Sequence, residues 1–112
     1  MDLKALVEKL DLKVICGEES LDNEVKGAYI SDLLSDVMGT AEQGAVWVTL
    51  QVHLNIIAVA TLKELSAILC VKGRVPDEET LEKARSQDVV ILSSTMSTYE
   101  VAGRLWDLGI RP

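Results

Sequence analysis

The fold is decided by residues 67–92, which run AILCVKGRVPDEETLEKARSQDVVIL. The apolar run Ala67–Val71 has the length and the β-branched content of a buried strand, and the turn residues Lys72-Gly73-Arg74 end it. Pro76, followed by three acids, starts a helix, because proline fits the first turn and acids complement the helix dipole. We expect this helix to run to about Ser86 and a second buried strand to follow at Val89–Leu92. This order predicts a parallel pair of strands joined by a right-handed crossover.

The same alternation continues on both sides of this stretch. Asp2 is placed to cap a first helix, and the residues Ser31-Asp32 are placed to cap a later one that buries Leu33, Leu34, Val37 and Met38. The remaining expected elements are strands at Leu12–Cys16, Val25–Ile30 and Ala45–Leu50 and helices at Leu3–Leu10, from Ser31-Asp32 through Met38, within Val52–Leu65 and at Tyr99–Leu108. For Val52–Leu65, a helix capped by Asn55 is favoured over a strand. The pattern predicts a three-layer α/β/α fold, with a mainly parallel sheet of about five strands, in a single domain over residues 1–112.

Composition and charge exclude several classes of function. The chain has 112 residues, of which 48% are hydrophobic and 4% aromatic, and its formal net charge is −7. Such a surface repels duplex nucleic acid, so we expect no nucleic-acid partner. Residues 1–56 carry ten acids against four bases, whereas residues 57–112 carry eight against seven. The weaker acidity of residues 57–112 therefore favours this half of the chain as the place of any anion-binding site.

Cysteines and apolar runs point to a protein without a metal, a cofactor or a membrane anchor. Cys16 and Cys70 match no metal-ligand or redox spacing, and each lies in an apolar run, where a thiol behaves as a small hydrophobe. The longest apolar region, around Leu54 to Leu62, is far shorter than the ~20 residues that span a bilayer. The N-terminus does not resemble a signal peptide, so we expect a cytoplasmic location.

Polar side chains follow the strands at the points where they end. The carboxyl ends of parallel strands meet at one edge of a sheet, where small hydroxyls, helix N-termini and a cation can hold a phosphate group. The candidate ligand-binding residues are Ser31, Asp32, His53, Asn55, Lys72, Gly73, Arg74, Ser94, Thr95 and Thr98. The alternative is that these residues only cap the following helices or lie in solvent.

Motifs for catalysis are missing. The sequence has no P-loop, no dinucleotide-binding glycine motif and no nucleophile elbow. An enzyme would have to use His53, the only histidine, together with Asp32 or Ser94. We therefore favour a non-catalytic module over a small enzyme.

Four segments, in this order, resemble the DRTGG domain family. They are residues 26–38 (KGAYISDLLSDVM), 46–51 (VWVTLQ), 71–80 (VKGRVPDEET) and 91–102 (ILSSTMSTYEVA). The pentapeptide that names the family does not occur. Its nearest counterpart is Val71-Lys72-Gly73-Arg74, of which only Gly73 carries over, as a turn glycine.

The resemblance implies a fold similar to the N-terminal domain of HPr kinase/phosphorylase and a regulatory role without catalysis. Members of the family accompany phosphotransacetylases and pyrophosphatases regulated by adenine nucleotides. The family context therefore implies a module that senses a nucleotide or another phosphate-bearing ligand. Short members that stand alone resemble companions of iron-hydrogenase systems, which implies the alternative of a structural partner in a redox complex.

An excess of apolar residues in the middle of the chain predicts self-association. Val46 to Leu69 holds more large apolar side chains than one small core needs, and an exposed apolar patch of that size is usually covered by another surface. We expect a homodimer around this segment, with Trp47 or Trp106 as an anchor. The alternative is that the segment forms a fully buried central strand and helix.

Overall fold

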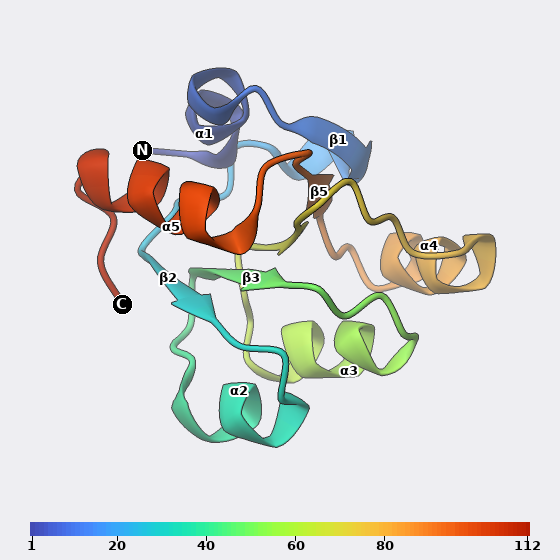
Figure 1. Cartoon of the computed structure of the whole chain (residues 1–112). Helices are drawn as coiled ribbons and strands as arrows, with labels where there is room; N and C mark the ends of the chain where they lie inside the picture. The colour runs from blue at the N-terminus through green and yellow to red at the C-terminus, as the bar shows by residue number, and fades with distance from the viewer.

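The computed structural model describes residues 1–112, with a central sheet between layers of helices (Figure 1). In chain order the elements are α1 (Leu3–Leu10), β1 (Lys13–Cys16), the short 3-10 helix η1 (Glu18–Ser20), β2 (Gly27–Ile30), α2 (Leu34–Thr40), β3 (Ala45–Thr49), α3 (Asn55–Leu62), β4 (Ala67–Cys70), α4 (Glu78–Ser86), β5 (Ile91–Ser93) and α5 (Thr98–Asp107). Every expected strand is present, with end points that differ by at most about two residues from those expected, which is the ordinary uncertainty of element ends. Residues 67–92 form the strand, helix and strand that the sequence predicts.

The strands lie in the order β1-β5-β4-β3-β2. β2 to β5 pair in parallel and in chain order, whereas β1 runs antiparallel to β5, with Lys13 opposite Ser93. The predicted α/β class with a mainly parallel sheet is confirmed. The order of the parallel strands never reverses, so the sheet has no crevice of the kind that forms where strand order changes direction.

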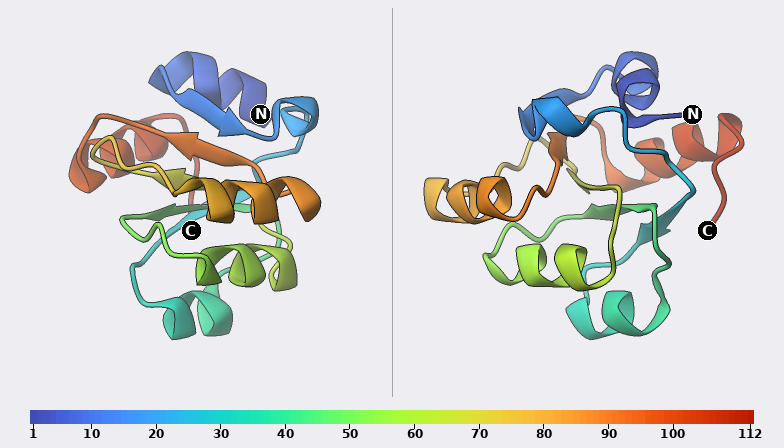
Figure 2. Two further views of the ribbon diagram at one scale, coloured as in Figure 1. Left: turned by 90° about the vertical axis from the view of Figure 1, so that its right-hand side faces the viewer. Right: turned by 180° about the vertical axis from the view of Figure 1, so that it is seen from behind.

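Helices cover both faces of the sheet, and each face has its own core. α1 and α5 pack on one face through Leu6 and Leu105, while α2, α3 and α4 pack on the other through Val37, Ile56 and Leu81. The views in Figures 1 and 2 show α2, α3 and α4 gathered on one side of the sheet and α1 and α5 on the opposite side. The three-layer α/β/α arrangement is thereby confirmed.

The middle of the chain is buried in these two cores, which corrects the expected surface for self-association. Along β3, Val46 and Val48 enter the core of α1 and α5, and Trp47 between them enters the core of α2, α3 and α4. Trp47 is fully buried, and its indole N–H donates a hydrogen bond to the Ser31 carbonyl at 2.8 Å. The apolar excess fills two cores rather than one. Trp47 is therefore not an available anchor, and Leu62 is the one large apolar side chain of this segment that stays exposed.

Two helix starts differ from the sequence-based expectation. α2 begins at Leu34 without a side-chain cap, and Leu33 and Met38 are exposed, so neither belongs to its buried face. This short helix lies over the edge strand β2, and Val37 is its only fully buried residue. α3 begins at Asn55 itself, so Asn55 is not a cap.

Both ends of the chain are tied to the beginning of β2. The Met1 carbonyl accepts a hydrogen bond from the Val25 N–H at 2.9 Å, and the Arg111 carbonyl accepts one from the Ala28 N–H at 3.1 Å. The first and last residues therefore reach the same short stretch of backbone.

A pair of glycine substitutions tests the packing of the turn after β1. Gly17 has φ +92°, and a Cβ there would lie 2.9 Å from the Val90 Cα, whereas a Cβ at Gly39 in α2 meets nothing within 4 Å. We expect Gly17→Ala to lower the free energy of unfolding by about 2 kcal/mol or more, because the left-handed conformation and the contact are both strained. Gly39→Ala, the matched control, should raise that free energy by about 0.5–1 kcal/mol. Urea unfolding of both variants measures the difference, and equal effects would contradict the packing described for Gly17.

Candidate ligand-binding site

The carboxyl edge of the sheet brings together three of the expected residues. Asp32 follows β2, His53 follows β3 and Arg74 follows β4, and all three line one open pocket of about 430 Å³. The complete lining is Asp32, Leu50, Gln51, Val52, His53, Arg74 and Asp77. Gln51 and Asp77 are two polar residues of this lining that the sequence analysis did not assign to it.

Asp32, which follows β2, forms hydrogen bonds with residues at the end of β3. Its Oδ1 accepts hydrogen bonds from the Thr49 hydroxyl at 2.9 Å and from the Leu50 N–H at 2.7 Å. Its carbonyl accepts a third, at 3.0 Å, from the Gln51 side-chain amide. Asp32 therefore does not cap α2, and its carboxylate is held at the rim of the pocket.

His53 is oriented by the first turn of α3. Its Nδ1 accepts the N–H of Asn55 at 3.2 Å, so the neutral imidazole carries its proton on Nε2. The ring then offers a hydrogen-bond donor rather than a free basic nitrogen. Asn55 supplies only this backbone contact and does not line the pocket.

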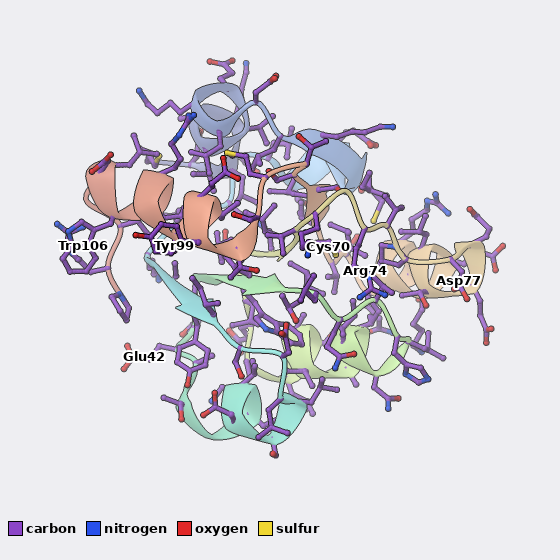
Figure 3. The ribbon with its side chains drawn as sticks, in the orientation of Figure 1. Glu42, Cys70, Arg74, Asp77, Tyr99 and Trp106 are labelled. Carbon is purple, nitrogen blue, oxygen red and sulfur yellow. The ribbon has the colours of Figure 1, made fainter.

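Arg74 lies on a loop that is bound to the next connection of the sheet. The N–H groups of Lys72 and Gly73 donate to the carbonyls of Met96 and Ser94, and the Ser93 hydroxyl donates to the Arg74 carbonyl at 2.9 Å. Figure 3 shows Arg74 between Cys70 and Asp77 at the edge of the sheet. Its guanidinium makes no salt bridge in the chain, which leaves its donors available.

The backbone conformation of the turn before Arg74 explains why residue 73 is a glycine. Lys72 has φ +58° and Gly73 has φ +70°, so two successive residues are in the left-handed region. Glycine adopts that conformation without steric cost. Lys72 and Gly73 shape the loop but do not line the pocket.

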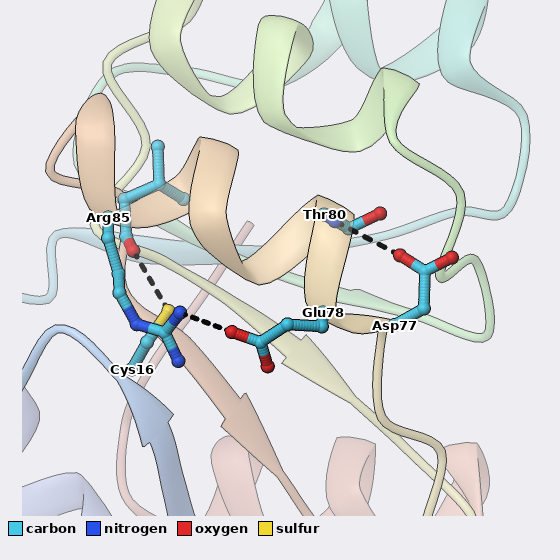
Figure 4. A network of polar contacts seen from close by, with 6 residues as sticks. Cys16, Asp77, Glu78, Thr80 and Arg85 are labelled. Atoms are coloured by element: carbon cyan, nitrogen blue, oxygen red, sulfur yellow. Dashed lines mark hydrogen bonds and ion pairs between the residues drawn. The ribbon is translucent and has the colours of Figure 1, made fainter.

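Asp77 caps α4 and faces the pocket as well. Its Oδ1 accepts the Thr80 N–H at 3.0 Å (Figure 4), and hydrogen bonds from Thr80 hold the pKa of the Asp77 carboxyl below its usual value of 3.8. The nearby charge of His53 adds to this lowering. Figure 4 also shows the ion pair between Glu78 and Arg85, 2.9 Å long, along the exposed side of the same helix. Asp77, one of the three acids that predicted this helix in the sequence, thus also lines the pocket.

The remaining candidates lie elsewhere. Ser94 and Thr95 line a separate hollow with Lys9, Asp11 and Arg104, beside α1 and α5. Ser31 accepts the Leu33 N–H, and Thr98 is the first residue of α5. The N-terminus of α5 is already occupied by a capping box, in which Ser97 and Glu100 bind each other's backbone N–H. Of the ten expected residues, three therefore share the pocket, two line the separate hollow, and five line neither.

Neither cysteine lines the pocket, although the Cys70 thiol contacts the carbonyl of Gln51, which does, at 4.0 Å. Both are buried, and burial raises the pKa of the Cys70 thiol to about 12 and the pKa of Cys16 above its usual value. A thiol with such a pKa stays protonated at neutral pH and is a poor nucleophile. No group of three or more histidine, cysteine or acidic side chains is placed to hold a metal ion.

Comparison with known proteins decides the family. The model of the DRTGG domain matches residues 5–108, which is nearly the whole chain. The chain belongs to the DRTGG domain family. No curated protein matches it in sequence, and no helix of this DRTGG domain is both long and apolar enough to cross a bilayer.

A solved structure shares the fold of this DRTGG domain. It is the regulatory region of a Clostridium perfringens pyrophosphatase, composed of CBS and DRTGG domains and complexed with the activator diadenosine tetraphosphate. The match has a TM-score of 0.74 at 13% identity and covers 93% of this chain. It covers only 45% of the pyrophosphatase region, so this chain spans less than half of that relative.

The pocket of this DRTGG domain combines donors and acceptors. Arg74 and the Nε2–H of His53 can donate to phosphoryl oxygens, and a charge-assisted bond from a guanidinium is the stronger kind. The carboxylates of Asp32 and Asp77 can accept hydrogen bonds from hydroxyl or N–H groups. One guanidinium faces two carboxylates, so the pocket suits a ligand that carries both an anionic group and neutral donors.

The role of Asp32 is tested by removing its carboxylate. Asp32→Ala leaves the buried Thr49 hydroxyl and the Leu50 N–H without their acceptor, and we expect a loss of about 1–3 kcal/mol in the free energy of unfolding. Thr49→Val removes the orphaned hydroxyl, so the double variant should lose less than the sum of the two single variants. Denaturant unfolding of all four proteins gives the coupling. Strict additivity would show that the Thr49 contact does not stabilise the fold.

The cap at Asp77 predicts an acid-dependent stability. Its folded-state pKa is lowered, so the contribution of the cap is complete above the unfolded pKa and is lost as the pH falls through the folded pKa, below 3.8. Asparagine caps a helix but does not titrate in this range. We expect the melting temperature of the wild type to fall relative to that of Asp77→Asn only at such acidic pH. A difference that is constant across the acidic range would contradict the lowered pKa.

Proposed function

We propose that this DRTGG domain is a non-catalytic regulatory module that binds a nucleotide or a similar phosphate-bearing ligand in the pocket at the carboxyl edge of the sheet. The observation that carries this proposal is the set of polar groups converging from three connections: unpaired Arg74, His53 oriented by Asn55, and the carboxylates of Asp32 and Asp77. The side chains of Asp32, His53 and Asp77 each accept a hydrogen bond from a backbone N–H, so these three lose little conformational freedom when a ligand binds.

The charges favour a nucleoside phosphate over a free phosphate ion. An inorganic phosphate would gain Arg74 but would face two carboxylates, and like charges at short range are repulsive. A nucleoside phosphate also offers ribose hydroxyls and base N–H groups, which these carboxylates can bind. That the similar pyrophosphatase region was complexed with an adenine dinucleotide supports this choice of ligand class.

The absence of catalysis is part of the proposal. With Nδ1 of His53 engaged by the Asn55 N–H, the imidazole has no free lone pair for proton abstraction unless that bond breaks. The thiol of Cys70 is protonated at neutral pH because burial raises its pKa to about 12. Binding therefore explains this pocket better than turnover does. The module is proposed to work as a homodimer, since α5 leaves two aromatic side chains exposed.

A thermal-shift series tests the ligand class. We expect AMP, ATP or diadenosine tetraphosphate to raise the melting temperature, and inorganic phosphate at the same concentration to raise it less, because a ligand selective for the folded state stabilises it. Arg74→Ala should weaken the binding of the best nucleotide by about tenfold or more, as measured by calorimetry. Lys72→Ala removes an exposed cation from the same loop outside the pocket, and it serves as the matched control.

Three results would contradict the proposal. No nucleotide of the series shifts the melting temperature, or Arg74→Ala binds as tightly as the wild type, or Lys72→Ala loses as much affinity as Arg74→Ala. The last result would indicate attraction by general charge rather than binding in this pocket.

A further inference from the structure

A second hollow lies beside the two helices that cover one face of the sheet, α1 and α5. Figures 1 and 2 show these helices on the same side of the sheet. The hollow has a volume of about 240 Å³, whereas one water molecule takes up about 30 Å³ in the liquid, so a group of several heavy atoms fits into it. It is lined by Lys9, Leu10, Asp11, Ser94, Thr95, Met96 and Arg104.

Two cations reach this hollow from different helices, and neither is paired with an acid. Lys9 lies in the last turn of α1 and Arg104 lies in α5, and neither side chain forms a salt bridge. Asp11 lines the same hollow, yet its carboxylate is within salt-bridge distance of neither cation. Two positive charges against one negative charge give the hollow a positive net charge, in a chain whose formal net charge is −7.

The connection after β5 adds hydrogen-bond donors that the chain leaves free. Ser94 is 4% exposed, and its Oγ accepts the Met96 N–H at 3.0 Å. The Ser94 hydroxyl itself donates to no atom of the chain, although a buried donor without an acceptor costs free energy. Thr95, which also lines the hollow, has a backbone N–H without a partner in the chain. These donors can be satisfied only by an acceptor from outside the chain.

We propose that this hollow is a second anion site, which binds a phosphate group, either as the free ion or as the terminal phosphate of a small metabolite. Lys9 and Arg104 supply charge-assisted hydrogen bonds to the phosphoryl oxygens. The Ser94 hydroxyl and the Thr95 N–H supply neutral ones from the connection after β5. The site is separate from the function proposed above, because no residue of the hollow lines the pocket of Arg74.

The charges of the two sites favour different ligands. The pocket holds one guanidinium, a neutral imidazole and two carboxylates, whereas the hollow holds two cations and one carboxylate. Inorganic phosphate therefore prefers the hollow, because it meets fewer like charges there. Helix dipoles do not reverse this preference. The end of α1 and the residues just before α5 both border the hollow, and the partial charges of these two helix ends have opposite signs.

Helix stability explains the two cations only in part. Lys9 and Arg104 each lie in the last turn of their helix, where a cation complements the helix dipole. That role does not require both side chains to line one hollow. It also leaves the free hydroxyl of Ser94 without an explanation, whereas a bound phosphate group accounts for the cations and the hydroxyl together.

A titration with inorganic phosphate, followed through the backbone amide resonances of the isotope-labelled protein, tests the site. We expect saturable shifts of the amides of Asp11, Thr95 and Met96, which line the hollow. Chloride at the same ionic strength should not reproduce these shifts, because it screens charges without forming the same hydrogen bonds.

Substitutions of exposed cations separate the site from general attraction. Lys9→Gln and Arg104→Gln should each weaken phosphate binding about tenfold, because each removes a charge-assisted hydrogen bond. Lys4→Gln is the matched control. It removes an exposed cation from the same helix as Lys9 but outside the hollow, so we expect its phosphate affinity to equal that of the wild type.

A phosphomonoester such as glycerol 3-phosphate, titrated in the same way, distinguishes the two forms of the ligand. Shifts of the same amides by both compounds assign the hollow to a terminal phosphate group, and shifts by inorganic phosphate alone assign it to the free ion.

Three results overturn the site. The amides of Thr95 and Met96 show no saturable shift, or phosphate instead shifts the amides of Leu50 and Gln51 at the pocket, or Lys4→Gln weakens binding as much as Lys9→Gln. Nucleotide binding is judged separately, by calorimetry on the variant of the pocket guanidinium. The failure of one proposal therefore leaves the other with its own result.

Discussion

The structure depends on the burial of β3 and β4 on both faces of the sheet. Every residue of these two strands is buried, and neighbouring side chains along each strand belong to different cores. A strand in this position must be apolar throughout, or its polar atoms must find partners. Thr49 is the one polar residue of these strands, and the Asp32 carboxylate satisfies its hydroxyl. The two helix layers and the polar edge of the sheet follow from this arrangement.

The same constraint explains why the polar groups gather where they do. The buried strands hold only four or five residues, so the chain returns to solvent after a short distance and its first exposed residues lie close together. Hydrogen bonds between side chains and backbone then fix these residues: the Asp32 carboxylate accepts the Leu50 N–H, and the Ser93 hydroxyl donates to the Arg74 carbonyl. Polar side chains at this edge are thus held by the fold itself. The residues that line such a pocket can be substituted easily, because loop sequences tolerate substitution whereas the sequences of buried strands do not.

Sequence patterns predicted those features that depend on neighbours along the chain. Asp2 caps α1 as expected, because an N-cap bonds only two or three residues ahead. The start of α4 was also predicted, although Asp77 is its cap and Pro76 lies before the first turn instead of in it. Asp32 has the same local signal, yet its carboxylate binds Thr49, a partner 17 residues away that only strand pairing brings near. Strand order and the antiparallel β1 are likewise set by contacts between distant segments. The convergence of His53 and Arg74 was predictable because parallel strands share one direction, whereas their separation from Ser94 was not.

Both termini of the chain are bound to one short stretch of backbone, Met1 to Val25 just before β2 and Arg111 to Ala28 within it. A domain whose entry and exit points lie so close can be placed within a loop of a host protein without forcing the host's two halves apart. The same proximity permits a circular permutation, in which a short linker joins Met1 to Pro112 and new ends open elsewhere. The fold thus suits insertion into a longer protein.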